Sequence, residues 1–183
     1  MNAHERLVAL LRSRSLKTGD FVLTSGKRST WYVDCRRTTM HAEGLALVGE
    51  LGLAAIRGAG WTADAVGGMT LGADPVAYAI ALTSNAHPPA IHGFTVRKAA
   101  KEHGMGQRIE GCFERGARVV VIEDSITTGG SALSAIEAVR AEGGLVTGVL
   151  AVVDRGEGGL QAIEAAGAPV QALVAASELL KGV

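Results

Sequence analysis

The sequence predicts an α/β fold in which a central parallel sheet is flanked by helices on both faces. From about residue 64 onward, short apolar strands alternate with segments of helical periodicity, and repeated strand-then-helix units build parallel sheets. The apolar runs at residues 118–122 and 146–153 are also rich in β-branched residues, as buried strands are. Ligands of such sheets bind at the carboxyl ends of the strands.

A smaller N-terminal part precedes these units. Residues 1–15 predict an amphipathic helix and not a signal peptide, because charged side chains interrupt the apolar residues. Residues 21–23 and 31–33 are strand candidates that flank a turn at residues 25–28, and residues 45–53 predict a second helix.

The repeated units then follow along the chain without any linker or internal repeat, so we expect a single domain over residues 1–183. The predicted strands and helices alternate: a strand at residues 65–66, a helix through Val76 and Ile80, strand segments at 90–91 and 94–96, a strand at 118–122, a helix at about 130–141, a strand at 146–153 and a helix at 161–166.

The composition limits the classes of function. The chain has 183 residues, is 48% hydrophobic, and carries 18 basic and 18 acidic side chains. This zero formal net charge gives no reason to expect a nucleic-acid or membrane surface, so an anion site has to be local. Two cysteines, Cys35 and Cys112, are too few for a disulfide framework and favour a reduced, cytoplasmic setting. The histidines and cysteines lack the spacing of a zinc site.

The stretch RVVVIEDSITTGGSA at residues 118–132 carries the strongest functional signal. Its glycines, its hydroxyl side chains and the start of the following helix can form a phosphate cradle. Glu123 and Asp124 directly follow the predicted strand and would repel phosphate, so we expect them to face ribose hydroxyl groups of the same ligand. The alternative is an ordinary strand–turn–helix connection with Asp124 as a cap. A Walker loop is excluded because no lysine follows the glycines, and GGMTLG at residues 67–72 lacks the dinucleotide spacing.

This stretch resembles the phosphoribosyl-pyrophosphate (PRPP) signature of the type I phosphoribosyltransferases. The resemblance implies the fold of that family, with a hood at about residues 1–40, a core at about 41–183 and a mobile loop at about 98–111. It implies that the acids bind ribose, that the loop binds the 5-phosphate and that Asp124 stabilises a ribosyl cation. The PRPP-binding residues implied here are Glu123, Asp124, Ser125, Ile126, Thr127, Thr128, Gly129, Gly130 and Ser131.

A cationic segment, TVRKAAKEHGMGQRIEG at residues 95–111, has a solvated charged loop as its plain interpretation. It also resembles the VRK..K.HG loop of the orotate phosphoribosyltransferases. That resemblance implies that Arg97, Lys98, Lys101 and His103 contact PRPP, and that Lys101 assists the departing pyrophosphate. The corresponding loop of the family enters the neighbouring subunit's site, which implies a homodimer with shared active sites.

Three further segments fit the same resemblance. GGMTLGADP at residues 67–75 resembles the family's pyrophosphate loop, although Leu71 stands where some relatives carry lysine. The segment FVLTSGKRSTWYVD resembles the hood over the base, with Tyr32 against orotate and Thr24 at another lysine position. Arg155 could form a surface ion pair with Asp154, or it could bind a planar carboxylate, which orotate has. By resemblance, Arg155 and Thr127 bind orotate.

Together these resemblances imply an enzyme that transfers ribose 5-phosphate from PRPP to orotate, giving orotidine 5′-phosphate and pyrophosphate in pyrimidine synthesis. Mg²⁺ is expected, held mainly by PRPP oxygens, with no metal site built by protein side chains alone. Two alternatives remain: a phosphoribosyltransferase for a purine or uracil, and a non-catalytic regulator that senses PRPP. The second should add a basic face or a DNA-binding segment, and the neutral chain has neither.

Overall fold

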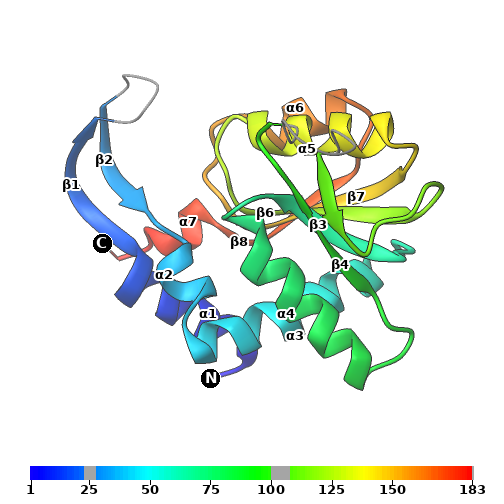
Figure 1. Ribbon diagram of the computed structural model, residues 1–183. Coiled ribbons are helices and arrows are strands. Elements are labelled where there is room, and N and C mark those ends of the chain that lie inside the picture. Colours follow the sequence, from blue (N-terminus) through cyan, green and yellow to red (C-terminus); the bar gives the residue numbers. More distant parts are fainter. Residues whose placement is uncertain (23–27, 100–107, 183) are drawn as a thin grey trace.

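A six-stranded sheet with helices on both faces forms the centre of the computed structural model, which describes residues 1–22, 28–99 and 108–182 (Figure 1). The strand order is β5-β4-β3-β6-β7-β8. Neighbouring strands run parallel, except that the edge strand β5 is antiparallel to β4. The strands are β3 (Ala65–Met69), β4 (His92–Val96), β5 (Ile109–Gly111), β6 (Arg118–Ile126), β7 (Leu145–Asp154) and β8 (Val170–Ala175).

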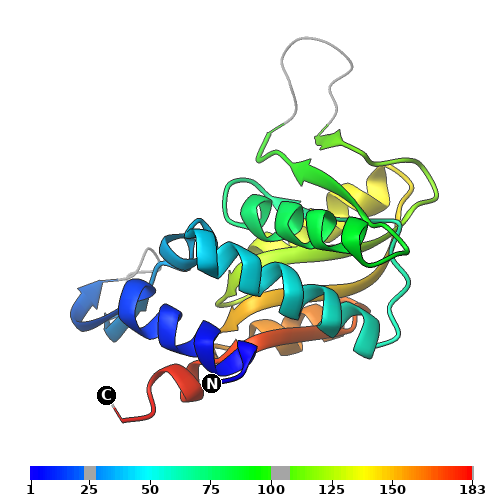
Figure 2. The same ribbon diagram turned by 90° about the horizontal axis from the view of Figure 1, so that it is seen from below.

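Two hydrophobic cores lie on opposite faces of this sheet. Along β6, Val120 and Ile122 belong to the core under α3 (Ala42–Gly58) and α4 (Ala73–Ala86). Val119 and Val121 belong to the core under α5 (Gly130–Ala141) and α6 (Gly159–Ala165). Successive side chains of a strand point to opposite faces, so the run of β-branched residues in β6 is buried on both sides. Figure 1 shows α5 and α6 above the sheet, and Figure 2 shows α3 and α4 side by side across the other face.

The N-terminal part is tied to the C-terminus. Its elements are α1 (Ala3–Leu10), a π-helical turn η1 (Leu11–Ser15), the antiparallel strands β1 (Leu16–Val22) and β2 (Arg28–Val33), and α2 (Arg36–Thr39). The Asn2 side chain caps α1 by accepting from the Glu5 N–H. Arg12 donates to the Leu179 and Lys181 carbonyls at the end of α7 (Ala176–Leu179). The hairpin β1–β2 therefore stands beside the carboxyl end of the sheet on an anchored base (Figure 1).

Most predicted elements are present, with some differences. β6 extends to Ile126, so Glu123 and Asp124 belong to its last residues instead of following it. Gly67 and Gly68 lie within β3, and residues 92–96 form one strand. The short or edge elements β5, α2, β8 and α7 were not predicted.

The predicted mobile loop at about residues 98–111 ends differently from the expectation. Residues 109–111 form β5 and pair with β4. Residues 100–107, and with them Lys101 and His103, lie outside the described part of the chain. Within the described part, no helix is long and apolar enough to cross a membrane.

Candidate active site

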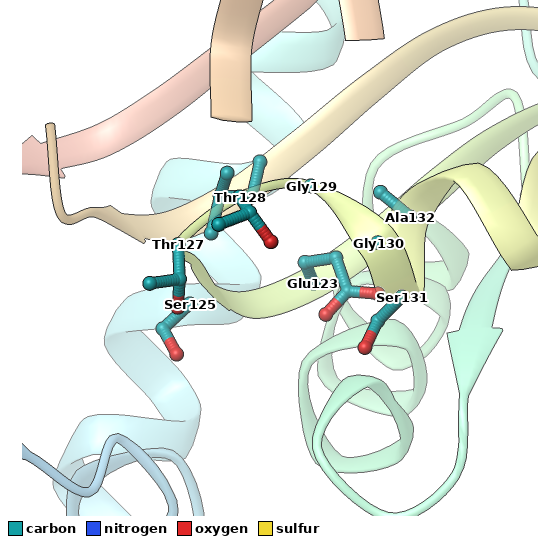
Figure 3. A pocket seen from close by; sticks show the side chains of 9 residues that line it. Glu123, Ser125, Thr127, Thr128, Gly129, Gly130, Ser131 and Ala132 are labelled. Carbon is teal, nitrogen blue, oxygen red and sulfur yellow. The ribbon is translucent and has the colours of Figure 1, made fainter. Parts of the chain in front are cut away.

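The loop after β6 encloses a cavity of about 200 Å³ at the start of α5 (Figure 3). Gly129 has φ of 85°, a left-handed conformation, and a Cβ there would lie 3.0 Å from the Gly159 carbonyl oxygen. Only glycine fits this tight turn, which brings the loop round to the helix. The first N–H groups of α5 have no acceptor within the helix and lie at this cavity. The lining residues are Glu123, Ser125, Ile126, Thr127, Thr128, Gly129, Gly130, Ser131 and Ala132.

Glu123 is the most deeply buried acid of the site. Its residue is 5% exposed, and its Oε1 atom has no hydrogen-bond partner among the described residues. Burial, followed by the charge of Asp124, raises the pKa of Glu123 to about 8. In Figure 3 its carboxylate points into the space between the loop and the start of α5, where Ser131 also points. A buried oxygen without a partner is suited to accept a hydrogen bond from a ligand hydroxyl group.

Asp124 faces a second cavity, of about 270 Å³. Its neighbours in β6 alternate between the two sheet faces, so Asp124 lies on the α4 side. A Cβ on Gly72, just before α4, would lie 2.7 Å from Asp124 Oδ1, so glycine lets the Asp124 carboxylate keep this position beside the backbone. Burial raises the pKa of Asp124, while the Ser125 N–H that it accepts at 2.8 Å and the charge of Arg36 lower it.

The two cavities share one wall. Glu123, Ser125 and Ser131 line both of them. The rest of the second cavity comes from residues 32–36, residues 69–72, Asp124 and Lys98. A ligand that lies across the shared wall can therefore reach the phosphate cradle with one end and the second cavity with the other.

Arg155 is buried beside the same strand ends. Its backbone N–H donates to the Ile126 carbonyl at 3.0 Å, and its guanidinium lies 4.5 Å from the centroid of the Trp31 ring. Its Nε atom is 3.1 Å from Glu157 Oε1, yet Nε and Nη2 are buried without a well-aligned hydrogen bond among the described residues. Arg155 is 9% exposed, so the alternative of a surface ion pair with Asp154 is wrong. The Arg155 guanidinium, stacked on Trp31 and with N–H groups free to donate, is suited to bind a planar carboxylate.

The sequence and fold of this chain are similar to those of known proteins. No family model matches the chain. A relative from Aquifex aeolicus (strain VF5), an orotate phosphoribosyltransferase, is 48% identical over 183 residues, which cover 98% of this chain and 99% of the relative. The crystal structure of Mycobacterium tuberculosis H37Rv orotate phosphoribosyltransferase in complex with Fe(III) dicitrate has a TM-score of 0.86, with 44% identity over 100% of both chains. The complex of that enzyme with PRPP has a TM-score of 0.82, with 41% identity over 97% of this chain and 99% of the other.

The chain belongs to the orotate phosphoribosyltransferase family. The predicted type I phosphoribosyltransferase fold is confirmed by the same agreement. Residues 125–131, from the end of β6 to the start of α5, line one cavity of this chain. The Ile126 side chain is itself buried in the core, so it also fixes the loop to the sheet.

The predicted residues of the cationic segment occupy different places in the structure. Lys98 lines the second cavity. Arg97, just after β4, lines neither cavity and pairs with Glu110 of β5 at 2.8 Å. Thr127 lines the first cavity, and Arg155 lines neither but contacts the adjoining Ile126. The sequence therefore identified residues around one site but did not predict which of them line each cavity.

Sequence reasoning missed several residues at this orotate phosphoribosyltransferase site. Trp31 stacks on Arg155, while Tyr32, which was expected to lie against orotate, lines the second cavity and packs against Phe21. Asp34 and Arg36 also line that cavity. Asp34 and Arg36 could have been found from the sequence, because they closely follow a predicted apolar strand, the same pattern that identified Glu123 and Asp124.

The raised pKa of Glu123 predicts a pH dependence of stability. The folded state holds a proton on Glu123 up to about pH 8, whereas the unfolded chain loses it near pH 4.5. Between these values the folded state binds more protons, so this group makes stability fall as pH rises. In Glu123→Gln that decline should disappear. The free energy of unfolding of the variant, relative to that of wild type, should therefore rise by on the order of 2–4 kcal/mol from pH 5 to pH 8.

Thermal unfolding of ligand-free protein at several pH values measures this difference. Glu114→Gln is a matched control because Glu114 is exposed and lies outside both cavities. Its stability difference from wild type should not change with pH. A pH-independent difference for Glu123→Gln as well would show that Glu123 is ionised in the folded protein.

Proposed function

We propose that this protein catalyses the transfer of ribose 5-phosphate from PRPP to orotate, giving orotidine 5′-phosphate and pyrophosphate. The observation that carries the proposal is the pair of adjacent acids at the end of β6, buried Glu123 and half-buried Asp124, which line the cavities at the phosphate cradle. Membership of the orotate phosphoribosyltransferase family supports the choice of base. The reaction belongs to pyrimidine nucleotide synthesis.

PRPP binding follows from the division of the site into two cavities. The 5-phosphate takes the N–H groups and hydroxyls of the loop at residues 125–131, which is neutral in side-chain charge. The ribose hydroxyl groups donate to Glu123 and Asp124 at the shared wall. This contact replaces part of the solvation that both carboxylates lose on burial. The diphosphate extends into the second cavity, toward Lys98.

The chemical step is a displacement at the anomeric carbon. The bond from this carbon to the diphosphate oxygen breaks, the electron pair leaves with pyrophosphate, and the orotate nitrogen forms the new bond with inversion. Positive charge grows on the ribose ring in the transition state, and the carboxylate of Asp124 stabilises it. Lys101 is proposed to neutralise the departing pyrophosphate, with Arg97, Lys98 and His103 contacting PRPP; Lys101 and His103 lie outside the described residues.

Orotate is proposed to bind between the hood and the strand ends. Arg155 donates to the orotate carboxylate, and Thr127 contributes from the loop after β6. Trp31 holds the guanidinium plane from the other side. Neither uracil nor a purine base carries a carboxylate for Arg155.

Mg²⁺ is the proposed cofactor. The carboxylates of Glu123 and Asp124 are hard oxygen donors that fit this ion, and both lie where the PRPP ribose and diphosphate are proposed to meet. The diphosphate, the ribose hydroxyls and water would supply most of its ligands. When bound, Mg²⁺ supplies positive charge to the leaving group.

The protein is also proposed to act as a cytoplasmic homodimer with shared sites. Both cysteines are free thiols, Cys35 buried and Cys112 exposed, which suits a reducing compartment. Arg97 lies outside both cavities of its own chain, which suits a role in the partner's site.

The proposed reaction predicts a loss of orotate's ultraviolet absorbance when protein, PRPP and Mg²⁺ are combined. Uracil and adenine, offered at the same concentration, should give no product above background because neither has a carboxylate for Arg155. Chelation of Mg²⁺ should stop the reaction, and added Mg²⁺ should restore it. Equal turnover of uracil, or no turnover of any base, would refute the assignment.

Substitution of Arg155 should affect orotate far more than PRPP. Loss of the bidentate contact in Arg155→Ala should raise the Michaelis constant for orotate by about 10- to 100-fold, equivalent to about 1.5–3 kcal/mol. Arg155→Lys keeps the charge without the fork and should fall between. Steady-state kinetics with each substrate varied measures the effect, and circular dichroism checks the fold. An equal rise for both substrates would make Arg155 a structural residue.

Shared sites predict complementation between two inactive homodimers, Arg97→Ala and Asp124→Asn. After subunit exchange, one site of each mixed dimer combines intact Asp124 from one chain with intact Arg97 from the other. Half of the dimers are mixed and half of their sites are intact, so about a quarter of wild-type activity should return. Mass spectrometry of tagged chains verifies exchange. Mixed dimers that stay as inactive as their parents would show that Arg97 acts within its own subunit.

A further inference from the structure

Arg36 is a cation of the second cavity that the resemblance to known enzymes did not assign. It begins α2, directly after the hairpin, and lines this cavity together with Lys98, Leu71 and Asp124. Its side chain is 46% exposed, so the guanidinium is open to a ligand. The carboxylates of Asp34 and Asp124 line the same cavity, beside Glu123, which holds a proton up to about pH 8 in the ligand-free protein. A highly charged anion can enter only where cations offset them.

The Asp34 carboxylate holds Arg36 in one orientation. Arg36 Nε donates to Asp34 Oδ1 at 2.9 Å, and the Arg36 backbone N–H approaches the same oxygen at 3.3 Å. This contact, with the charge of Asp34, raises the pKa of Arg36. Among the described residues, neither Nη1 nor Nη2 of Arg36 has a hydrogen-bond partner. The end of the guanidinium fork is thus oriented and unused, which is the arrangement that binds two phosphate oxygens at once.

The shared wall between the cavities decides which part of a ligand meets Arg36. The 5-phosphate and the anomeric substituent of a phosphorylated ribose lie at opposite ends of the sugar. With the 5-phosphate in the loop at residues 125–131 and the ribose at the shared wall, the anomeric diphosphate reaches the second cavity. There it meets residues 69–72, which carry an exposed apolar side chain, Leu71, and no cation.

We propose that Arg36 binds the diphosphate of PRPP and the pyrophosphate product, and that Asp34 is its positioning residue. The inference rests on the proposed function and adds a residue to it. Arg36 and Lys98 approach the diphosphate from two different parts of the chain, α2 and the segment that follows β4. The hood thereby contributes charge to the leaving-group side of the site as well as cover for the base.

A rival role for Arg36 is to hold Asp124 ionised, because its charge lowers the pKa of Asp124. No hydrogen bond joins the two side chains in the described structure, so that effect acts at a distance. The two roles differ in what they do to ligands. A diphosphate contact changes the affinity for pyrophosphate alone, whereas an effect through Asp124 changes the affinity for the ribose as well.

Calorimetric titration with two probes, pyrophosphate and ribose 5-phosphate, each with Mg²⁺, separates these roles. Arg36→Gln should weaken pyrophosphate binding by about 10- to 100-fold and leave ribose 5-phosphate binding within about twofold of wild type. Arg36→Lys should give an intermediate loss because it retains charge without the fork. The matched control is Arg37→Gln, since Arg37 is the exposed neighbour that lines neither cavity. Its affinities for both probes should equal those of wild type.

The positioning role of Asp34 is tested by comparing its substitution in the wild-type and Arg36→Gln backgrounds. Asp34→Asn should weaken pyrophosphate binding several-fold, and it should have no further effect in the Arg36→Gln background, because a positioning residue acts only through the group that it orients. Additive losses would show that Asp34 acts independently and would overturn its assignment.

The assignment of Arg36 is overturned if Arg36→Gln binds pyrophosphate like wild type, if both probes weaken equally, or if only the Michaelis constant for orotate rises. These outcomes are distinct from a failure of the proposed function. In that case the wild-type protein itself would not convert orotate and PRPP, whatever the affinity of its variants for pyrophosphate.

Discussion

The site depends on the alternation of side chains along β6. This strand pairs with β3 and β7 and is buried on both faces, so its direction and register are fixed by both cores. Two adjacent acids at its end must then point to opposite faces of the sheet. Glu123 lines the cavity under the start of α5, and Asp124 approaches Gly72 on the α4 side. One strand end thus serves both cavities, and a single ligand can bridge them.

Burial of these acids has a cost that the fold does not recover by itself. Glu123 keeps an oxygen without a described partner, and burial raises the pKa of both carboxyl groups. Stability alone would favour apolar residues at the end of a strand that is otherwise aliphatic. In the proposed complex, the ribose hydroxyl groups of the ligand supply partners for these acids. Two glycines make room at the same site: Gly72 lies against the Asp124 carboxylate, and Gly129, with its positive φ, lies against the backbone of Gly159.

The sequence predicted the parts of this site that depend on neighbouring residues. The strand, the acids and the glycine loop are consecutive, so their pattern determines both the local structure and the chemistry. The edge strands β5 and β8 are short or partly exposed and give weak periodic signals. The contact of Trp31 with Arg155 joins residues far apart in the chain, and nothing local selects Trp31 over Tyr32. Likewise, only the packed structure brings Arg36 to the cavity that contains Asp124.

These distant contacts give the hood a definite mechanical role. Arg12 binds carbonyl groups of α7, and His4 contacts Glu178 at 2.8 Å, so the base of the hood is fixed to the end of the chain. From this base, β2 carries Trp31 to Arg155, and α2 carries Arg36 to the second cavity. Two arginines are thus oriented by the hood: Arg155 lies against the Trp31 ring, and Arg36 is held by the Asp34 carboxylate. Orientation of both before the substrates arrive lowers the entropy lost at the transition state, because neither guanidinium has to be ordered during the reaction.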